Sequence, residues 1–358
     1  MTPTPAFPTQ ARLSKEQIAE RYWRCLETGC PDKSCHVSLL LPRRWRPVDV
    51  PSTPPTPEQP MAALSLARSL DEPRGEIEIG AVLLEREVAP ADWLANFLEA
   101  SGHAIVESRR QWSRGGDVAD VLTRCETPAG PGLARWLAIK DHNRLFVLQA
   151  RCLEAHYAAH ADDFLVAISS FAPIHPSRWP LAERLRSFTR RQPGDFCLFY
   201  PESWRLQQDP ASSANAHVLH VISVVDGSVA GKMTLAAVAR HAEDDPQKLA
   251  DNYLAELERA GFRASRVPLA ASQPVGGFEA VWQSHMEAAR RDSTIEVRLT
   301  VGKRPDAWFL LALLGPSRQT APDLWAVNKR AYEILLEWFR TPPEQDDGTP
   351  DGSEEAAR

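Results

Sequence analysis

The sequence predicts an α+β protein in which one unit, built of many strands and few helices, occurs twice. The length of 358 residues allows two domains, at about 100–200 residues each. Short apolar segments bounded by turn residues outnumber the helical patterns, which is typical of strands. Finally, the pair Pro42 and Trp45 recurs as Pro201 and Trp204, and the same separation relates Gly102 to Gly261. Self-similarity over so long a period indicates duplicated structural units.

Composition narrows the class of protein. Hydrophobic residues make up 43% of the chain, and the formal charge is −6. A globular protein is therefore expected, and the acidic balance argues against nucleic-acid binding, which usually needs a basic stripe. No apolar run reaches the roughly 18–20 residues that span a bilayer. The first residues lack a secretory-signal pattern, so we expect a cytoplasmic protein with its six cysteines reduced.

The first residues of the chain combine two different patterns. Residues 1–13 are rich in proline and threonine and are predicted to be disordered. Ser14 with Gln17 forms a capping box, so 14–36 is predicted to hold an N-terminal helix that stops at Gly29. The apolar residues of this segment recur at helical spacing: Ile18, Tyr22, Cys25 and Leu26.

The first repeat is predicted over 37–172 and the second over 196–341, with a proline-rich linker at 173–195. An acidic tail at 342–358 is predicted to be disordered. Strands of the first repeat are expected near 37–42, 62–70, 75–88, 104–113, 118–126, 133–140 and 144–153. Those of the second are expected near 196–201, 217–225, 231–240, 263–269, 277–288, 293–302 and 306–314. Helices are expected at 90–101, 161–171, 246–260 and 324–340.

The repeated unit resembles the PsbP-like fold, which the photosystem protein PsbP shares with a Ran-binding nuclear import factor and bacterial DcrB-like proteins. The matching stretches are LLLPRRWRP and LFYPESWRL, the helices WLANFLEASG and YLAELERAG, and the closing AYEILLEWF. The resemblance implies two tandem α/β sandwich domains, each an antiparallel sheet flanked by helices. It also implies a non-catalytic protein that binds other proteins. One bacterial branch of the family acts as chaperones for effectors of type VI secretion.

Catalytic signatures are missing from the sequence. Phosphate-binding glycine loops, a H-E-x-x-H pair and a G-x-S-x-G elbow do not occur. We therefore expect no catalytic residues and no cofactor.

One cluster of cysteines with a neighbouring histidine fits an alternative interpretation as a metal site. Cys25, Cys30 and Cys35 are evenly spaced, with His36 beside the last of them, and both gaps fall within the range of structural zinc sites. A second ligand pair does not follow, so small buried cysteines are the favoured interpretation. A metal-binding regulator or metal-dependent enzyme using these four residues remains the alternative. His156 and His160 near Asp162 or Asp163 offer a weaker version of it.

A partner-binding surface is predicted on one strand of the second repeat. In FEAVWQSHMEA, Trp282, Ser284 and Met286 fall on the same side of the strand. Methionine and aromatic residues are enriched at adaptable binding surfaces, so these three could line an apolar groove. The competing interpretation is ordinary core beneath a helix.

These observations favour a protein-binding module, such as a secretion-system chaperone or adaptor, whose partner is another protein such as a secreted effector. The tandem is expected to be a monomeric pseudo-dimer or a homo-oligomer. Besides the metal alternative, a structural subunit of an envelope or conjugation assembly also fits.

Overall fold

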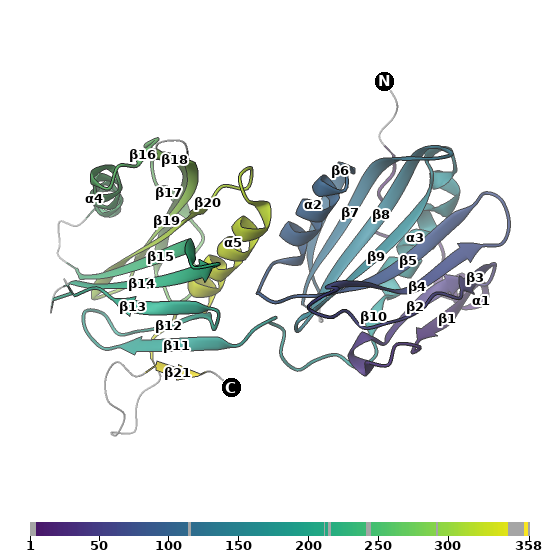
Figure 1. The fold of residues 1–358 in the computed structure, drawn as a ribbon, viewed down its shortest axis with the longest axis horizontal. Helices are drawn as coiled ribbons and strands as arrows, with labels where there is room; N and C mark the ends of the chain where they lie inside the picture. Colours follow the sequence, from purple (N-terminus) through teal and green to yellow (C-terminus); the bar gives the residue numbers. More distant parts are fainter. Residues whose placement is uncertain are drawn as a thin grey trace. The chain divides into compact units, whose positions relative to one another are not determined.

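The computed structural model describes residues 5–113, 116–210, 212–213, 216–240, 245–290, 293–342 and 354–356. The chain divides into two compact units, unit 1 (Met1–Ala182) and unit 2 (Glu183–Arg358). Each unit has its own sheet and helices (Figure 1).

Unit 1 starts with a short helix and a two-stranded hairpin. These are α1 (Lys15–Arg21), β1 (Tyr22–Glu27), η1 (Lys33–Cys35) and β2 (Val37–Pro42). The main sheet follows, with β3 (Trp45–Val48), β4 (Met61–Ser69), β5 (Gly75–Leu83), β6 (Ala104–Ser113), β7 (Gly116–Thr127), β8 (Gly130–Asp141) and β9 (Arg144–Leu153). The remaining elements are α2 (Pro90–Ala100), η2 (Glu154–His156), α3 (Tyr157–Ser170) and β10 (Ala172–Pro173).

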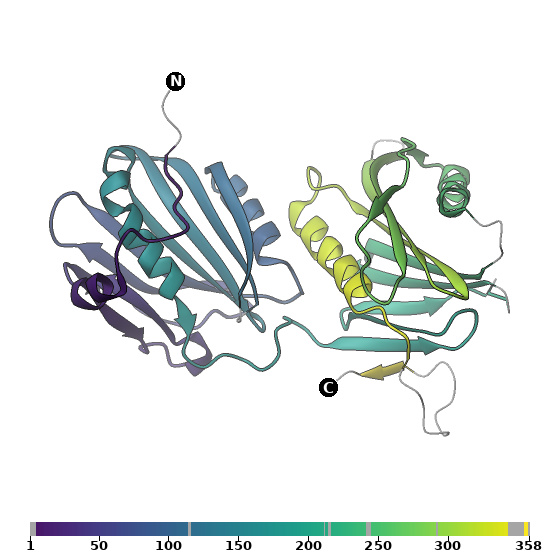
Figure 2. The same ribbon diagram turned by 180° about the vertical axis from the view of Figure 1, so that it is seen from behind.

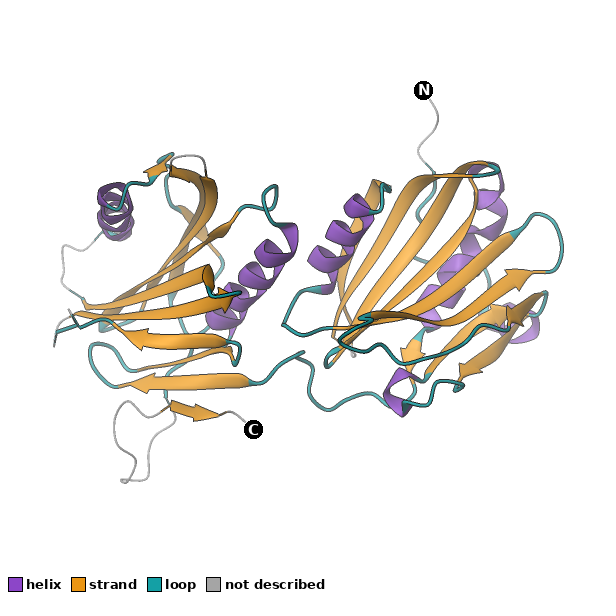
Figure 3. Cartoon of the chain, viewed as in Figure 1, coloured by secondary structure: helices purple, strands orange, loops and turns teal. Residues whose placement is uncertain are grey.

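The main sheet of unit 1 is antiparallel, in the order β3-β4-β5-β9-β8-β7-β6. Helix α3 and the hairpin β1–β2 pack on one face of it, and α2 packs on the other (Figures 2 and 3). Alternation along the strands produces this arrangement. On β8, Leu133 and Leu137 join the core with Phe164 of α3, whereas Trp136 points to the opposite face, against Phe97 of α2.

In unit 2, strands and two helices follow one another along the chain in the same order as the main strands and helices α2 and α3 of unit 1. Its strands are β11 (Leu185–Arg190), β12 (Phe196–Pro201), β13 (Trp204–Gln208), β14 (Ala216–Val225), β15 (Ser228–Ala239), β16 (Arg263–Ala264), β17 (Ala270–Ser272), β18 (Ala280–Arg290), β19 (Ser293–Lys303), β20 (Ala307–Pro316) and β21 (Glu354–Ala356). The helices are α4 (Pro246–Arg259) and α5 (Pro322–Glu337).

The main sheet of unit 2 has the order β13-β14-β15-β20-β19-β18-β16, which repeats the strand order of unit 1. Trp45 and Trp204 begin the equivalent strands β3 and β13, and both are fully buried. Gly102 and Gly261 follow the equivalent helices with φ of 74° and 89°, a left-handed conformation that favours glycine. The predicted fold class, antiparallel sheets flanked by helices, is therefore confirmed.

The predicted N-terminal helix is wrong in its second half. The capping box at Ser14 is present, but the helix ends at Arg21, and the next residues form strand β1. Strand β1 pairs with β2 from Tyr22↔Pro42 to Glu27↔Val37 and so satisfies one edge of that apolar strand. Helix α1 by itself buries no residue, so packing gives no reason to extend it.

Two other predicted segments also differ from the structure. In 1–13, predicted to be disordered, Phe7 is buried in the core of unit 1, while residues 1–4 lie outside the described residues. In the linker 173–195, residues Leu185–Arg190 form strand β11. Phe188 of this strand packs into the core of unit 2.

The predicted tail 342–358 falls mostly outside the described residues. Of it, Glu354–Ala356 form β21 against the open edge of β11, where unpaired backbone groups accept a further strand. Within the described part of the chain, no helix has both the length and the apolar character required to cross a bilayer.

Candidate functional site

The three residues predicted to bind a partner lie on β18 and face α4. Trp282, Ser284 and Met286 pair with Val301, Leu299 and Val297 of β19. Their environments differ from the expected open groove. Met286 is 4% exposed in the core beneath α4, and Ser284 is buried, donating a hydrogen bond to the carbonyl oxygen of Val267 at 3.0 Å. Trp282 is half-buried against the ring of Trp308.

The exposed groove is therefore not formed at Ser284 and Met286, because α4 and the segment before β17 cover that part of the sheet. Partner binding through these residues stays a prediction, and it requires this cover to move.

The residues of the metal alternative are buried in unit 1. Cys25, Cys30 and Cys35 all join its hydrophobic core, and burial raises the pKa of Cys35 to about 11. The ring of His36 contacts the carbonyl oxygen of Cys30 at 2.9 Å. Throughout the described ranges, no group of three or more His, Cys, Asp or Glu is arranged to hold a metal ion. The four residues thus form no ligand set.

The second possible metal site, at His156 and His160, is also not formed. His160 is fully buried between Trp45 and Phe164, with its Nε2 atom 2.9 Å from the carbonyl oxygen of Pro73. It packs α3 onto the sheet. His156 lies one turn earlier, in η2.

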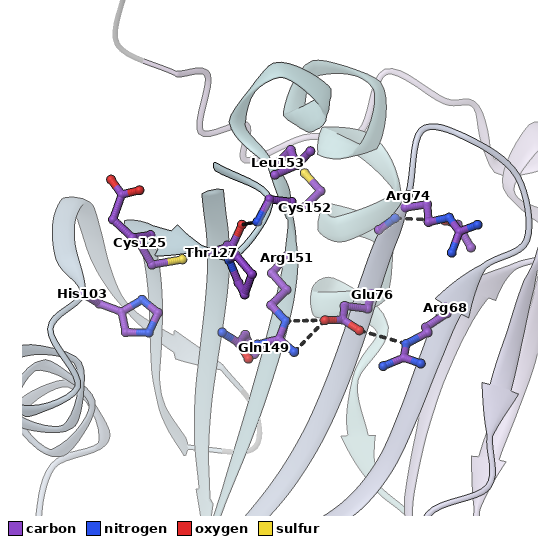
Figure 4. Close-up of a pocket in the computed structure, with 15 residues that line it drawn as sticks. Arg68, Arg74, Glu76, His103, Cys125, Thr127, Gln149, Arg151, Cys152 and Leu153 are labelled. Atoms are coloured by element: carbon purple, nitrogen blue, oxygen red, sulfur yellow. Dashed lines mark hydrogen bonds and ion pairs between the residues drawn. The ribbon is translucent and has the colours of Figure 1, made fainter. Parts of the chain in front are cut away.

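A different site lies on the α2 face of unit 1, in a cavity of about 540 Å³ that we call the α2-side pocket. Strand ends build most of it, as Figure 4 shows. The side chains that characterise it are Arg68, Arg74, Glu76, His103, Cys125, Thr127, Gln149, Arg151 and Cys152.

Strand register sets a row of charges across this pocket. Arg68 on β4 lies opposite Glu76 on β5, and Glu76 lies opposite Arg151 on β9. Their neighbours Ala67, Ile77 and Ala150 enter the core, so the three charged side chains point to the other face.

Both arginines bind the same carboxylate. The Nε atoms of Arg68 and Arg151 donate to Glu76 at 3.0 and 2.6 Å (Figure 4). Burial by itself raises the pKa of Glu76, but the hydrogen bonds and charges of the two arginines outweigh it and lower that pKa below its ordinary value. Glu76 is therefore ionised at neutral pH. Arg74, also at the pocket, pairs with the exposed Glu72.

On the side of the pocket towards α2, His103 lies edge-on to the ring of Trp136, and its Nδ1 atom is 3.3 Å from the hydroxyl of Thr123. Burial, with the charge of Arg151, lowers the pKa of His103, so the ring is neutral at neutral pH.

The thiols of the pocket are poor nucleophiles. Burial raises the pKa of Cys125 above its ordinary value and that of Cys152 to about 12, so both remain protonated. Besides the carboxylates of Glu76 and Glu126, the pocket therefore offers cationic and neutral hydrogen-bond donors rather than an activated nucleophile.

The charged row is absent from the matching place in unit 2. In unit 1 the row runs from Arg46, the residue after Trp45, to Arg68, Glu76 and Arg151. In unit 2 the row that starts after Trp204 runs through Arg205, Ile222, Lys232 and Leu314. Because apolar residues take the places of Arg68 and Arg151 in the same fold, these arginines are not required by the architecture.

Sequence reasoning missed this pocket. The available signal was the alternation of Glu76 with Ile77 and of Gln149 and Arg151 with apolar residues, which marks a polar sheet face. Which strands lie side by side, and hence which charges meet, depends on the sheet order.

No protein-family model and no curated protein sequence matches the chain. Among solved structures, the PsbP protein (CyanoP) of the cyanobacterium Synechocystis is 14% identical, with a TM-score of 0.34, and the alignment covers 43% of this chain and 92% of that one. LpqN of Mycobacterium tuberculosis, involved in cell envelope biogenesis, is 19% identical, with a TM-score of 0.29, over 44% of this chain and 92% of that one.

A third similar structure extends over both units. The type VI secretion immunity protein TplEi of Pseudomonas aeruginosa is 13% identical, with a TM-score of 0.26, over 78% of this chain and 95% of that one. At TM-scores this low, none of these likenesses assigns a function or a partner to this chain.

Proposed function

We propose that this chain is a non-catalytic binding protein and that the α2-side pocket of unit 1 takes an acidic segment of a partner protein. The observation that carries the proposal is the arrangement of Arg68 and Arg151 around one carboxylate, Glu76. Because two guanidinium groups share this single carboxylate, they keep N–H donors that can bind a second carboxylate.

The exposure of the two arginines supports this proposal. The side chains of Arg68 and Arg151 are 58% and 41% exposed, so a partner can reach them without unfolding the sheet. The neutral His103 and the amide of Gln149 line the same pocket and supply uncharged donors. The protonated thiols of Cys125 and Cys152 favour binding over covalent catalysis.

A chaperone or adaptor role in a secretion system is a narrower form of the same proposal. In that form the acidic segment belongs to a secreted effector, and the complex must release it. Recovery of a stable, unreleased complex would favour a structural role in a larger assembly.

The test uses the full chain and a hexaglutamate peptide, with hexaglutamine as the uncharged control, in titration calorimetry. Arg151→Gln should weaken hexaglutamate binding at least about ten-fold, the loss typical of a charge-assisted contact. Higher salt should weaken binding to the wild type as well.

Arg259→Gln is the matched control. This residue lies on α4 of unit 2, in an exposed ion pair with Glu256, and its loss changes the net charge by the same amount. The affinity of this variant should equal that of the wild type. Equal weakening by both substitutions, or equal binding of hexaglutamine, would contradict the proposal.

A further inference from the structure

The N-terminal arm, residues 5–13, inserts one aromatic ring into the face of unit 1 that lies opposite the α2-side pocket. Phe7 is 7% exposed and is the only buried residue of the arm. Two arginines lie over its ring. The Cζ atom of Arg109 on β6 lies 3.8 Å from the ring centroid, and that of Arg135 on β8 lies 4.6 Å from it. Such cation–π contacts recognise an aromatic side chain whichever segment carries it.

The arm is held by few other contacts. Arg109 donates a hydrogen bond to the carbonyl oxygen of Phe7, and the backbone N–H of Arg12 donates to Asp162 at 3.3 Å. The described residues of the arm form no helix or strand before Lys15. The arm thus binds as an extended peptide with a single side-chain anchor.

Buried donors around Phe7 are left unused. Arg135 is 1% exposed and makes a two-pronged ion pair with Asp120, at 3.0 and 2.7 Å, through Nε and Nη2. Its Nη1 atom, the Nη1 atom of Arg109 and the hydroxyl of Tyr157 are buried without a hydrogen-bond partner among the described residues. Buried polar groups are normally paired, so these donors indicate a ligand that brings acceptors the arm lacks.

We propose that Arg109, Arg135 and Tyr157 form a peptide-binding site that Phe7 plugs. Its ligand is an extended segment of another protein that presents an aromatic side chain with an acidic side chain beside it. The ring replaces Phe7 against the two arginines, and the carboxylate accepts hydrogen bonds from the unpaired guanidinium nitrogens. This site lies on the opposite face of the sheet from the α2-side pocket and does not depend on the function proposed for that pocket.

Competition with the arm makes the proposal measurable. A tethered segment acts at a high effective concentration, on the order of millimolar for a short flexible linker. The wild type should therefore bind a free peptide more weakly than a full-length variant whose arm lacks the ring.

The probe is a labelled peptide of arm residues 3–11 carrying Pro8→Asp, which places a carboxylate next to the phenylalanine. Its binding to the full-length wild type and to full-length Phe7→Ala is followed by fluorescence anisotropy. Phe7→Ala should bind at least about ten-fold more tightly than the wild type. Equal affinities, or no binding to either protein, would overturn the proposal.

Two peptide controls test the chemistry of the ligand. Replacing the phenylalanine of the peptide by alanine should abolish measurable binding to Phe7→Ala. Replacing the aspartate by asparagine should weaken binding about five-fold or more, as expected when a charge-assisted hydrogen bond becomes a neutral one. A peptide that binds equally well without its ring, or without its charge, refutes the corresponding part of the proposed ligand.

A second measurement needs no variant protein. Displacement of the arm breaks the hydrogen bond between Arg12 and Asp162, so the peptide should accelerate tryptic cleavage after Arg12 in the wild type. The probe contains no lysine or arginine and is not itself cut. A cleavage rate that the peptide leaves unchanged counts against the plug even if Phe7→Ala fails to fold.

Discussion

At the scale of single residues, Asp163 joins three parts of unit 1. The hydroxyl of Tyr22 donates to it at 2.6 Å, Arg44 forms an ion pair with it, and the Nδ1 atom of His160 lies 3.6 Å away. Burial by itself raises the pKa of Asp163, but the nearby His160 ring, the hydrogen bond from Tyr22 and the ion pair with Arg44 outweigh it and lower that pKa below 3.8. The folded state therefore favours the ionised carboxylate.

Tyr22→Phe should lower the free energy of unfolding by about 1.5–3 kcal/mol at neutral pH, the usual value of a hydrogen bond to a charged group. Tyr157→Phe is the matched control, because the buried hydroxyl of Tyr157 has no described partner. Its removal should leave the free energy of unfolding unchanged or raise it, because that hydroxyl already lacks a partner. Urea denaturation of the two variants measures both values, and equal losses would contradict this account of Asp163.

The same carboxylate predicts the response to acid. A lowered pKa in the folded state stabilises the protein above the ordinary value of 3.8, and this contribution is lost as the pH falls through the lowered pKa. The difference between the wild type and Tyr22→Phe should therefore shrink between about pH 5 and about pH 2. A difference that stays constant over this range would exclude a charged partner for Tyr22.

At the scale of elements, the hairpin β1–β2 shows how pairing overrides a helical pattern. In a helix, Tyr22 and Leu26 would share one face, as residues four apart do. In strand β1, Tyr22 and Cys25 are buried, whereas Leu26 is 59% exposed. The residues Tyr-Trp-Arg-Cys also favour a strand, because aromatic side chains fit a half-buried sheet surface.

Cys25→Gln should therefore destabilise unit 1 by about 2–4 kcal/mol, because it buries an amide without a partner. Leu26→Gln, one residue away, should cost less than about 0.5 kcal/mol, as exposed substitutions do. Urea denaturation compares the two. A larger loss for Leu26→Gln would restore the helical interpretation of this segment.

At the scale of the whole molecule, each unit has its own hydrophobic core. The core of unit 1 draws on β1, β2, the main sheet and α3, and that of unit 2 on β11, β12, its main sheet and α5. The end of unit 1 is held by side chains of the segment before α2 and of the β8–β9 turn. The backbone N–H of Ala182 donates to the buried Glu87, which also pairs with Lys140, and the carbonyl oxygen of Leu181 contacts His142.

A fragment of residues 1–182 should therefore fold alone and unfold in one cooperative transition. A fragment of residues 1–172, which ends at the boundary predicted from the sequence, should be less stable by about 1–3 kcal/mol, because a buried acceptor on Glu87 loses its donor. Thermal and urea denaturation of the two fragments compares them. Equal stabilities would place the end of the unit at 172.

Much of the fold could be predicted from local signals. Pro42 with Trp45, Pro201 with Trp204, and the helix-ending Gly102 and Gly261 mark equivalent positions, because their roles depend on nearby residues. Strands β1 and β11 were missed for a shared reason. Their sequences carry arginines at exposed or half-buried positions, and residues such as Cys25 and Phe188 become buried only when the strand pairs with its neighbour.

The candidate site was less predictable than the fold. Arg68, Glu76 and Arg151 come from three strands, and β9 pairs with β5 although three strands and a helix lie between them in the sequence. Phe7 likewise meets Arg109 and Arg135 across more than a hundred residues of chain. Local patterns mark each of these residues as polar or apolar but do not say which of them meet.

Local patterns of the sequence predict the duplicated α+β unit and most of its strands, because alternation, turn residues and helix ends act over a few positions. The three-dimensional arrangement shows which charges share a pocket and that Phe7 of the predicted disordered arm is buried. It also shows that the expected groove at Ser284 and Met286 is covered. These outcomes depend on sheet order and register, which side chains distant in sequence fix together through packing.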